Sequence, residues 1–483
     1  MPAPALALTM PTFHQARLPN GMRLVVVERR GLPLVTALLN VQAGSLMDPP
    51  DKSGLAELSL GLLSKGAQLG SRRLDAAALA AAAESLGGGF EISTGALGSR
   101  LSLTVMTPQL DQALGLLAAV SRAPTLPEAE LARSRAQMLE TLQFEQSDPA
   151  ALAEKLARRL FWGDAEPGRQ SSAKTLSRIK RADVQAFCRQ YLRPEHLSLV
   201  LAGDLDLAQG RALALRHFGQ WQPRPTALPA ISEAQARPDP PPEKSASALP
   251  RNLVLDLPGS GQSTVLVVAP FVGLASRASQ PSLGSPGQDL TLARSGALAN
   301  AVLGLGYSSR INQEVRIKRG LSYGAFSNVE SLPEGGMLTL GAQTQPAKAG
   351  EVLDLLRAEL RKLSEAEVTP SELAARQAVL IGELGRQLES TQGLAAAVAE
   401  QIERGEDLAE LALLPQQLQA LDASAVKAFA SRFWGADSLR SIVVTDLALA
   451  GAGLRELLPQ AWVIPAEQLD LDAASLRKTG RKP

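Results

Sequence analysis

The sequence predicts an α+β fold made of two homologous halves, each with largely antiparallel sheets packed against helices. Three observations support this prediction. Short apolar strand patterns alternate with amphipathic helix patterns and return through short connections, which favours antiparallel pairing. A proline-rich segment divides the chain near its middle. The residues on its two sides also repeat one another at a nearly constant spacing, as a duplicated unit does.

The first half shows the expected elements most clearly. Runs rich in valine and leucine predict strands, and an alanine-rich helix pattern ends in glycines that favour a helix stop. In order, we expect strands at 22–28 and 34–44, helices at 53–67 and 74–89, a hairpin-like strand pair within 90–106, helices at 108–123 and 127–144, and a strand at 197–205.

The proline-rich segment is residues 222–250. It contains eight prolines and has no apolar periodicity, so we expect an extended, exposed linker. It separates a predicted N-terminal half, residues 1–221, from a predicted C-terminal half, residues 251–483. A chain of 483 residues has enough apolar material for about two to four packed units.

The repeat across this linker is seen in matched positions. Val184 in "ADVQAFCRQYL" matches Val426 in "SAVKAFASRFW", and Glu130 in "PEAELARSRAQML" matches Glu372 in "TPSELAARQAVL". Both pairs are 242 positions apart (426 − 184 and 372 − 130). A third pair of segments, starting at 101 and 338, has an offset of 237, which indicates small insertions between duplicated halves.

Charge and composition exclude several classes of protein. Lys and Arg number 49 and Asp and Glu 48, so the net charge of +1 argues against nucleic acid as a main partner. No apolar run reaches the roughly 18–20 residues of a membrane span. The single cysteine, Cys188, excludes an intramolecular disulfide, and we expect it to be a buried apolar residue.

The start, "MPAPALALTMPTF", lacks the basic region and the long apolar region of a signal peptide. Its small apolar residues are similar to the start of a periplasmic protein after signal removal. We therefore expect a periplasmic location, with a cytoplasmic one as the alternative.

The order of several motifs resembles the pitrilysin and mitochondrial-processing-peptidase family of inverted zinc metallopeptidases. These motifs are "LPNGMRLVVVE" at 18–28, "AGSLMDPPDKSGLAE" at 43–57 and "LSLVLAGDL" at 197–205, followed by the duplicated second half. The resemblance covers nearly the whole chain. It implies that the two halves form a clam-like half-chamber, in which an extended peptide adds as a strand to a sheet edge. The matching strand here, residues 90–96, is expected to be architectural.

Active members of that family carry H-x-x-E-H on the helix after the "SGLA" turn, where two histidines bind zinc and the glutamate is the general base. Aligned on "SGLA", those three positions are Glu57, Leu60 and Gly61 in this sequence. The family's distant glutamate ligand falls on Arg133. The zinc motif is therefore degenerate, and we expect no metal and no cofactor in this chain.

The remaining histidines do not replace the motif. His14, His196 and His217 are the only ones, and none has metal-ligand spacing. Residues 53–67 are therefore expected to form a packing helix. Its buried side is predicted to carry four leucines, Leu55, Leu58, Leu62 and Leu63.

The second half contains a stretch, residues 300–331, that resembles the family's arginine and tyrosine pair. Arg316 and Tyr323 are seven positions apart (323 − 316), and Tyr307 is a secondary candidate for substrate binding. By resemblance, the tyrosine hydroxyl donates to the scissile carbonyl or oxyanion and the arginine holds a substrate carbonyl. The local residues alone favour a simpler explanation, with Arg316 as a cation that complements a helix C-terminus and Tyr323 as an ordinary half-buried strand residue. The resemblance over the whole chain reverses this preference.

The local pattern around this pair predicts its setting. Ser308 or Ser309 is expected to cap a helix, Gly320 to end it in the left-handed conformation, and Tyr323 to open a strand. "GLGYSS" lacks both the third glycine of a dinucleotide site and the lysine of a P-loop, so we interpret it as a turn.

These features lead to the hypothesis of a non-catalytic subunit in a heterodimeric zinc metallopeptidase. The chain would be inactive alone and would supply Arg316 and Tyr323 to a homologous partner that carries H-x-x-E-H and the zinc. The substrate would be an unfolded peptide. Two alternatives stay open, a structural subunit of a larger assembly and a peptide-binding module that does not cleave.

Overall fold

The computed structural model describes residues 10–223, 249–274, 286–333 and 335–478. Residues 1–9 and most of the predicted linker lie outside them. The described chain divides into two compact units. Unit 1 comprises Met1–Glu140, Ser171–Ser232 and Gly382–Leu414, and unit 2 comprises Thr141–Gln170, Glu233–Ile381 and Pro415–Pro483. The division of the sequence at the linker stays a prediction.

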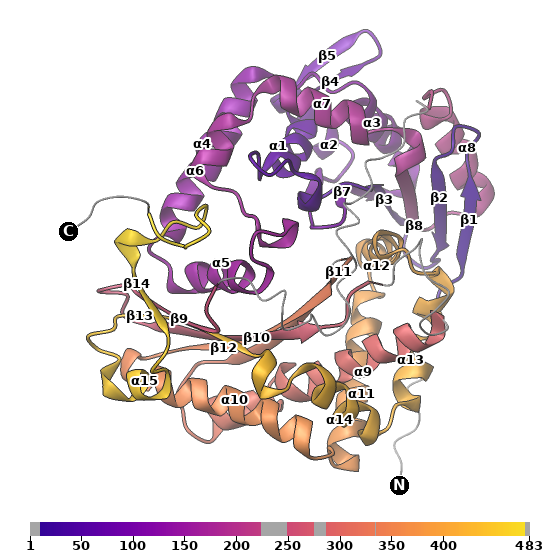
Figure 1. Ribbon diagram of the computed structural model, residues 1–483. Coiled ribbons are helices and arrows are strands. Elements are labelled where there is room, and N and C mark those ends of the chain that lie inside the picture. The colour runs from indigo at the N-terminus through magenta and orange to yellow at the C-terminus, as the bar shows by residue number, and fades with distance from the viewer. Residues whose placement is uncertain (1–9, 224–248, 275–285, 334, 479–483) are drawn as a thin grey trace. The chain divides into compact units, whose positions relative to one another are not determined.

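Unit 1 is built on a six-stranded mixed sheet in the order β1-β2-β8-β3-β7-β6 (Figure 1). Only β2 and β8 pair in parallel, so the sheet is largely antiparallel, as predicted. The strands are β1 (Phe13–Arg17), β2 (Arg23–Glu28), β3 (Leu34–Val41), β6 (Glu91–Thr94), β7 (Ser99–Met106) and β8 (Leu197–Gly203). A separate two-stranded ribbon joins β4 (Gly66–Leu69) to β5 (Arg72–Asp75).

Helices of unit 1 follow the predicted order in the first half of the chain. They are α1 (Leu55–Gly61), α2 (Ala76–Glu84), α3 (Leu110–Arg122), α6 (Ala173–Arg178), α7 (Arg181–Tyr191), α8 (Leu207–Phe218) and α12 (Thr391–Arg404). Three more helices contribute residues to both units: α4 (Glu128–Glu145), α11 (Pro370–Gln387) and α13 (Leu408–Ala420).

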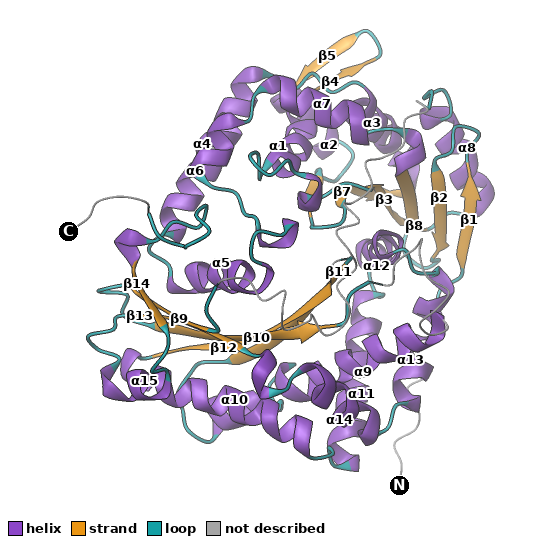
Figure 2. Cartoon of the chain, in the orientation of Figure 1, coloured by secondary structure: helices purple, strands orange, loops and turns teal. Residues whose placement is uncertain are grey.

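Unit 2 repeats the architecture with a sheet in the order β11-β12-β10-β13-β9-β14 (Figure 2). Its strands are β9 (Asn252–Asp256), β10 (Ser263–Phe271), β11 (Ala325–Leu332), β12 (Gly335–Thr344), β13 (Arg440–Thr445) and β14 (Trp462–Pro465). Its helices are α5 (Pro149–Trp162), α9 (Pro286–Gly304), α10 (Ala349–Glu365), α14 (Ala423–Phe433) and α15 (Gly451–Leu457). The α+β prediction, with two sheets each packed by helices, is confirmed.

The two sheets match strand for strand over five positions, but the helix on one face of each sheet comes from the other half of the sequence. Helix α5 packs on β10 and β13 in unit 2, whereas α12 packs on β3 and β8 in unit 1. These helices begin 242 positions apart (391 − 149), the spacing of the repeat. The duplicated halves have therefore exchanged equivalent helices.

Apolar side chains explain why α12 stays on the sheet of unit 1. Val398 and Ile402 of the helix pack against Val25, Leu38 and Val200 of three strands, and all five are at least 97% buried. Each such side chain contributes about 1.5–3 kcal/mol when it leaves water. Polar contacts at the ends of the helix add specificity, because Thr391 bonds Thr36 at 2.8 Å and Glu403 accepts two hydrogen bonds from Arg100.

Candidate functional site

The helix that resembles a zinc-binding helix is held at its start by a buried carboxylate. The Oδ2 of Asp48 accepts a hydrogen bond from the Gly54 amide at 2.7 Å, and Oδ1 accepts one from the Ala56 amide at 2.7 Å. Gly54 has a φ of 99°, a left-handed conformation that favours glycine. Burial raises the pKa of Asp48 to about 7, against the opposing effect of these amide donors.

The predicted packing role of the helix is confirmed, but the predicted range of 53–67 was too long, because residues 66 and 67 belong to β4. Helix α1 ends at Gly61 and continues as a 3-10 turn, Leu62–Lys65, and the four predicted leucines are all at most 4% exposed. Leu60 is also fully buried. A side chain at position 60 therefore lies in the apolar core.

The residues at the aligned zinc positions do not fit the metal. Zinc in peptidases needs imidazole or carboxylate ligands that converge on one point. Here Leu60 and Gly61 offer no donor atom, and Arg133 donates to Glu130 at 2.8 Å as an exposed ion pair. Glu57 alone supplies no site. Within the described residues, no group of three or more His, Cys, Asp or Glu side chains is arranged to hold a metal ion.

The histidines have separate surroundings. His14 lies 3.5 Å from the carboxylate of Glu28, and His217 lies 2.7 Å from that of Asp111. The hydrogen bond with His217 lowers the pKa of Asp111. His196 is the last residue of the 3-10 turn Pro194–His196, directly before β8. Nothing in the described chain brings the three rings together.

The stretch with the predicted arginine and tyrosine contains a π-helix, Asn312–Ile317. This wide helix is rare and is frequently found at functional sites. The Asn312 side chain fixes it to the start of β11, because its Nδ2 donates to the Ala325 carbonyl at 2.6 Å and its Oδ1 accepts from the Ala325 amide at 3.1 Å. Gly320 follows with a φ of 61°, the predicted left-handed stop. Arg316 thus lies in a rigidly anchored turn.

Two details of the local prediction were wrong. Neither serine caps a helix, because the Ser309 hydroxyl donates to the Gly306 carbonyl and the Ser308 hydroxyl accepts from Arg376. The strand opens at Ala325, two residues after Tyr323, because the turn from Gly320 to Gly324 must first reverse the chain.

The basic residues of this turn divide into two groups. Lys318 and Arg319 both pair with Glu314, and their hydrogen bonds lower the pKa of its carboxyl. Arg316 makes no ion pair with any residue that the structure describes. Instead its guanidinium lies over the Tyr307 ring, 5.0 Å from the centroid, at cation–π distance. Its hydrogen-bond donors are therefore available to a ligand.

Both predicted residues line one cavity of about 810 Å³ within unit 2. Tyr323 is 97% exposed, so its hydroxyl is free to reach a bound molecule. The floor includes Thr264, whose hydroxyl is buried without a hydrogen-bond partner, and its cross-strand neighbour Gln343. Helix α5 supplies Glu154 to the wall. The sequence prediction missed these last three residues, because the sequence does not show which sheet α5 covers or which strands lie beside Tyr323.

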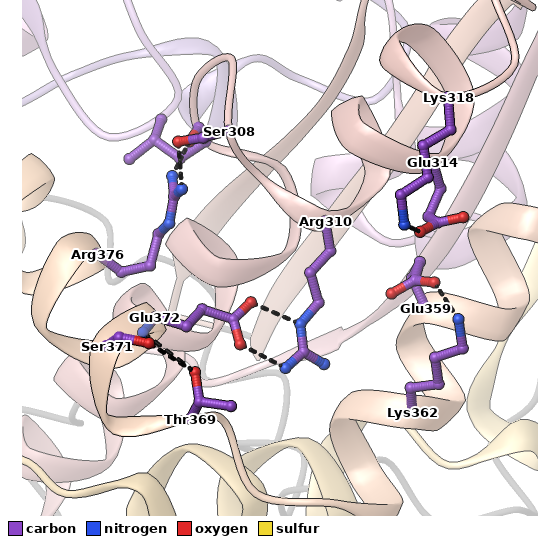
Figure 3. Close-up of polar contacts among 11 residues, drawn as sticks. Ser308, Arg310, Glu314, Lys318, Glu359, Lys362, Thr369, Ser371, Glu372 and Arg376 are labelled. Carbon is purple, nitrogen blue, oxygen red and sulfur yellow. Dashed lines mark hydrogen bonds and ion pairs between the residues drawn. The ribbon is translucent and has the colours of Figure 1, made fainter.

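A polar network holds the turn that carries Tyr307, and Figure 3 shows its side chains Ser308, Arg310, Glu372 and Arg376. Arg376 of α11 donates to the Leu305 carbonyl at 3.0 Å and to the Ser308 hydroxyl at 2.5 Å. Arg310 forms a bidentate pair with Glu372, with both distances 2.8 Å (Figure 3). Since both ends of the turn are tied to one helix, the Tyr307 ring is held where it meets Arg316.

The chemistry of this cavity is that of a binding and charge-stabilising surface. A guanidinium and a phenol hydroxyl donate hydrogen bonds, and amide side chains both donate and accept them. Such groups suit the carbonyl and amide groups of an extended peptide. The cavity wall has no histidine, cysteine or metal cluster among the residues described for it.

Two regions of the chain match models of known protein families. Residues 24–169 match the model of the insulinase family, peptidase family M16, and residues 178–380 match that of the peptidase M16 inactive domain. Together these matches cover most of the chain.

Relatives in bacteria agree with these matches. A protein of Streptomyces coelicolor named as an uncharacterized zinc protease is 25% identical over 393 residues, which cover 79% of each chain. The non-peptidase homolog YmxG of Helicobacter pylori is 23% identical over 386 residues, covering 78% of this chain and 80% of the relative.

Solved structures share the fold. The peptidase M16 inactive domain from Pseudomonas fluorescens has a TM-score of 0.77 at 24% identity, covering 90% of this chain and 98% of that one. A protease from Helicobacter pylori has a TM-score of 0.78 at 19% identity, covering 90% of this chain and all of the other.

Proposed function

Because this chain belongs to the M16 family of peptidases, we propose that it is the non-zinc subunit of a heterodimeric peptidase and lends Arg316 and Tyr323 to a zinc-bearing partner. The observation that carries the proposal is the contrast between two sites. The aligned zinc positions have no fitting donors, with Leu60 in the core, whereas Arg316 and Tyr323 open into one cavity.

In this proposal the two side chains act on the substrate peptide. The Arg316 guanidinium donates hydrogen bonds to a substrate carbonyl and holds the peptide in register. The Tyr323 hydroxyl donates to the oxygen on which negative charge develops. A donor that is already in position lowers the barrier, because little reorganisation is needed during reaction. The stacking of Arg316 on Tyr307 supports such preorganisation.

The partner is proposed to be a homologous chain with H-x-x-E-H that holds the zinc. Neither the metal nor a nucleophilic water is assigned to residues of this chain. Peptide chains are the proposed substrate, since the amide-rich floor matches backbone groups.

A second candidate function is a structural subunit without a peptidase role. The name of the Helicobacter pylori relative, a non-peptidase homolog, favours it. In that case Arg316 and Tyr323 would have no effect on any peptidase that copurifies with the chain.

The first experiment is affinity purification of the tagged chain from its native cells, followed by identification of bound proteins and zinc analysis. We expect one H-x-x-E-H chain per copy of this chain and one zinc per pair. The purified chain alone should bind no zinc and cleave no peptide. Stoichiometric zinc and peptide cleavage by the isolated chain would refute the proposal, and a zinc-free large assembly would favour the structural role.

A further inference from the structure

A second pocket, of about 430 Å³, lies within unit 1, on different elements from the cavity described above. Its walls are the end of α3, the turn at 123–126, one face of α7 and the segment after α8. Gln185, Cys188 and Arg189 stand on the same face of α7, because they are three and four positions apart.

The pocket is rich in positive charge. Arg122, Arg189 and Arg193 all line it, and the described lining contains no carboxylate. Arg122 gives one hydrogen bond to the His217 carbonyl at 2.9 Å. Arg193 is buried, gives one hydrogen bond to the Gln190 carbonyl at 2.7 Å and pairs with Glu195 at 3.7 Å, so Arg122 and Arg189 carry the excess charge of the lining. Arg189 is exposed and has neither a hydrogen bond nor an ion pair to another described residue. Since the whole chain has a net charge of +1, this cluster is a local excess.

One wall of the pocket is held in an unusual backbone conformation. Leu126 has a φ of 46°, one of two non-glycine residues with positive φ in the described chain. The Arg181 guanidinium holds it there by donating to the Leu126 carbonyl at 2.6 Å and to the Thr125 carbonyl at 3.0 Å. A leucine in this region costs about 1–3 kcal/mol, and residues strained in this way cluster at active sites, ligand clamps and switch regions.

The remaining lining is uncharged and partly apolar. The Arg122 guanidinium lies 6.0 Å from the centroid of the Trp221 indole. Burial raises the pKa of the Cys188 thiol to about 12, so this sulfur adds no negative charge near neutral pH. The indole, Leu126 and Leu192 therefore form an apolar surface beside the three guanidinium groups.

A simpler explanation is that arginines complement the helix ends. Arg122 and Arg189 lie in the last turns of α3 and α7, where cations are favourable. This explains their charge but not the strained wall, the apolar surface or the lack of a carboxylate in the lining.

We propose that this pocket binds a small organic oxyanion, a carboxylate or a phosphate group carried on a flat apolar body. The oxyanion accepts hydrogen bonds from Arg189 and Arg122, and the body packs beside Trp221 and Leu192. The volume of the pocket suits a ligand of this size.

Isothermal titration calorimetry of the full chain tests the proposal with four probes: phenyl phosphate, benzoate, inorganic phosphate and benzyl alcohol. We expect phenyl phosphate or benzoate to bind with a Kd below about 1 mM and more tightly than inorganic phosphate. The ranking of the two aromatic anions identifies the oxyanion. Benzyl alcohol, which has the ring without the charge, should bind at least about tenfold more weakly.

The variant Arg189→Gln should raise the Kd about tenfold, because one charge-assisted hydrogen bond is lost. Arg189 has no internal partner, so this change should leave the melting temperature unaltered. Arg211→Gln, at an exposed position of α8, is the matched control and should not change the Kd. The proposal is overturned if no aromatic anion binds at roughly 10 mM. It is also overturned if the two variants bind equally well, because the arginines then serve only the helix ends.

Discussion

The guanidinium carbon of Arg316 lies 5.0 Å from the centroid of the Tyr307 ring. Arg316 belongs to the π-helix, whereas Tyr307 belongs to the turn tied to α11 by Arg376 and Arg310. The contact therefore joins two separately anchored segments. It distinguishes Arg316 from Lys318 and Arg319, whose charges are used by Glu314.

The first prediction concerns the proposed donors. In the reconstituted pair with a zinc-bearing partner, Arg316→Lys and Tyr323→Phe should each lower kcat about 100-fold, as for the loss of one positioned oxyanion donor. The melting temperature should stay the same, since Tyr323 is almost fully exposed.

Arg319→Lys is the control for this prediction. It changes the same residue type in the same turn, at a side chain that pairs with Glu314 and is absent from the cavity lining. Equal peptidase rates for Arg316→Lys, Tyr323→Phe and Arg319→Lys would exclude a catalytic contribution and leave the structural role.

The second prediction concerns the position of Arg316. Tyr307→Leu removes the aromatic face, which at an exposed site contributes about 0.5–1 kcal/mol, and so should lower kcat/KM about threefold. Tyr307→Phe keeps the face and should retain the wild-type value. A loss of activity in the phenylalanine variant would mean that the hydroxyl, not the stacking, is what matters.

The third prediction concerns the ion pair between Arg310 and Glu372. Glu372→Gln breaks the bidentate pair with Arg310, in which both side chains are mostly buried, and should lower the free energy of unfolding by about 2 kcal/mol. Urea denaturation measures this change. Glu367→Gln, at an exposed position just before α11, is the control and should change the free energy of unfolding by less than about 0.5 kcal/mol. Equal free energies of unfolding for the two variants would show that the Arg310–Glu372 pair does not stabilise the fold.

The fourth prediction concerns pH and the start of α1. The pKa of Asp48 is about 7 in the folded chain and about 3.9 in an unfolded chain, so folding takes up a proton between these values. The stability contributed at this site should therefore fall as the pH rises from about 4 through 7.

Asp48→Asn should lack this pH dependence. Urea denaturation measures the free energy of unfolding of both proteins. The wild-type value minus the variant value should decrease from pH 5 to pH 8. Asp51→Asn, at an exposed neighbouring position, is the control and should track the wild type. A constant wild-type minus Asp48→Asn difference would show that Asp48 ionises normally.

Part of the fold was predictable because it depends on local pattern. Alternating apolar residues specify strands, and a leucine at every third or fourth position specifies the buried side of α1. The repeat of 242 positions likewise predicted that one architecture is used twice, and the two matching sheets confirm it. The absence of histidine at the zinc positions needs only the sequence.

Other features depend on contacts between distant residues. Arg316 and Tyr323 were predicted from a resemblance, but the cavity they share also needs Thr264 of a central strand and Glu154 of α5. The carboxylate that caps α1 belongs to Asp48, six residues before Gly54, whose amide donates a hydrogen bond to it. No capping motif predicts a carboxylate at this distance. The π-helix depends on Asn312 reaching the backbone of a strand that starts 13 residues later.

The sequence by itself determined the duplication, the α+β class, the degenerate zinc motif and the buried leucines of α1, because composition and periodicity act within one element. Only the tertiary structure decided that α5 packs on the second sheet and α12 on the first. An amphipathic helix shows in its sequence that one face must be buried, but not which apolar surface will cover it. The same physical reason applies to Arg316. Its guanidinium is available to a ligand because Glu314 pairs with Lys318 and Arg319 instead.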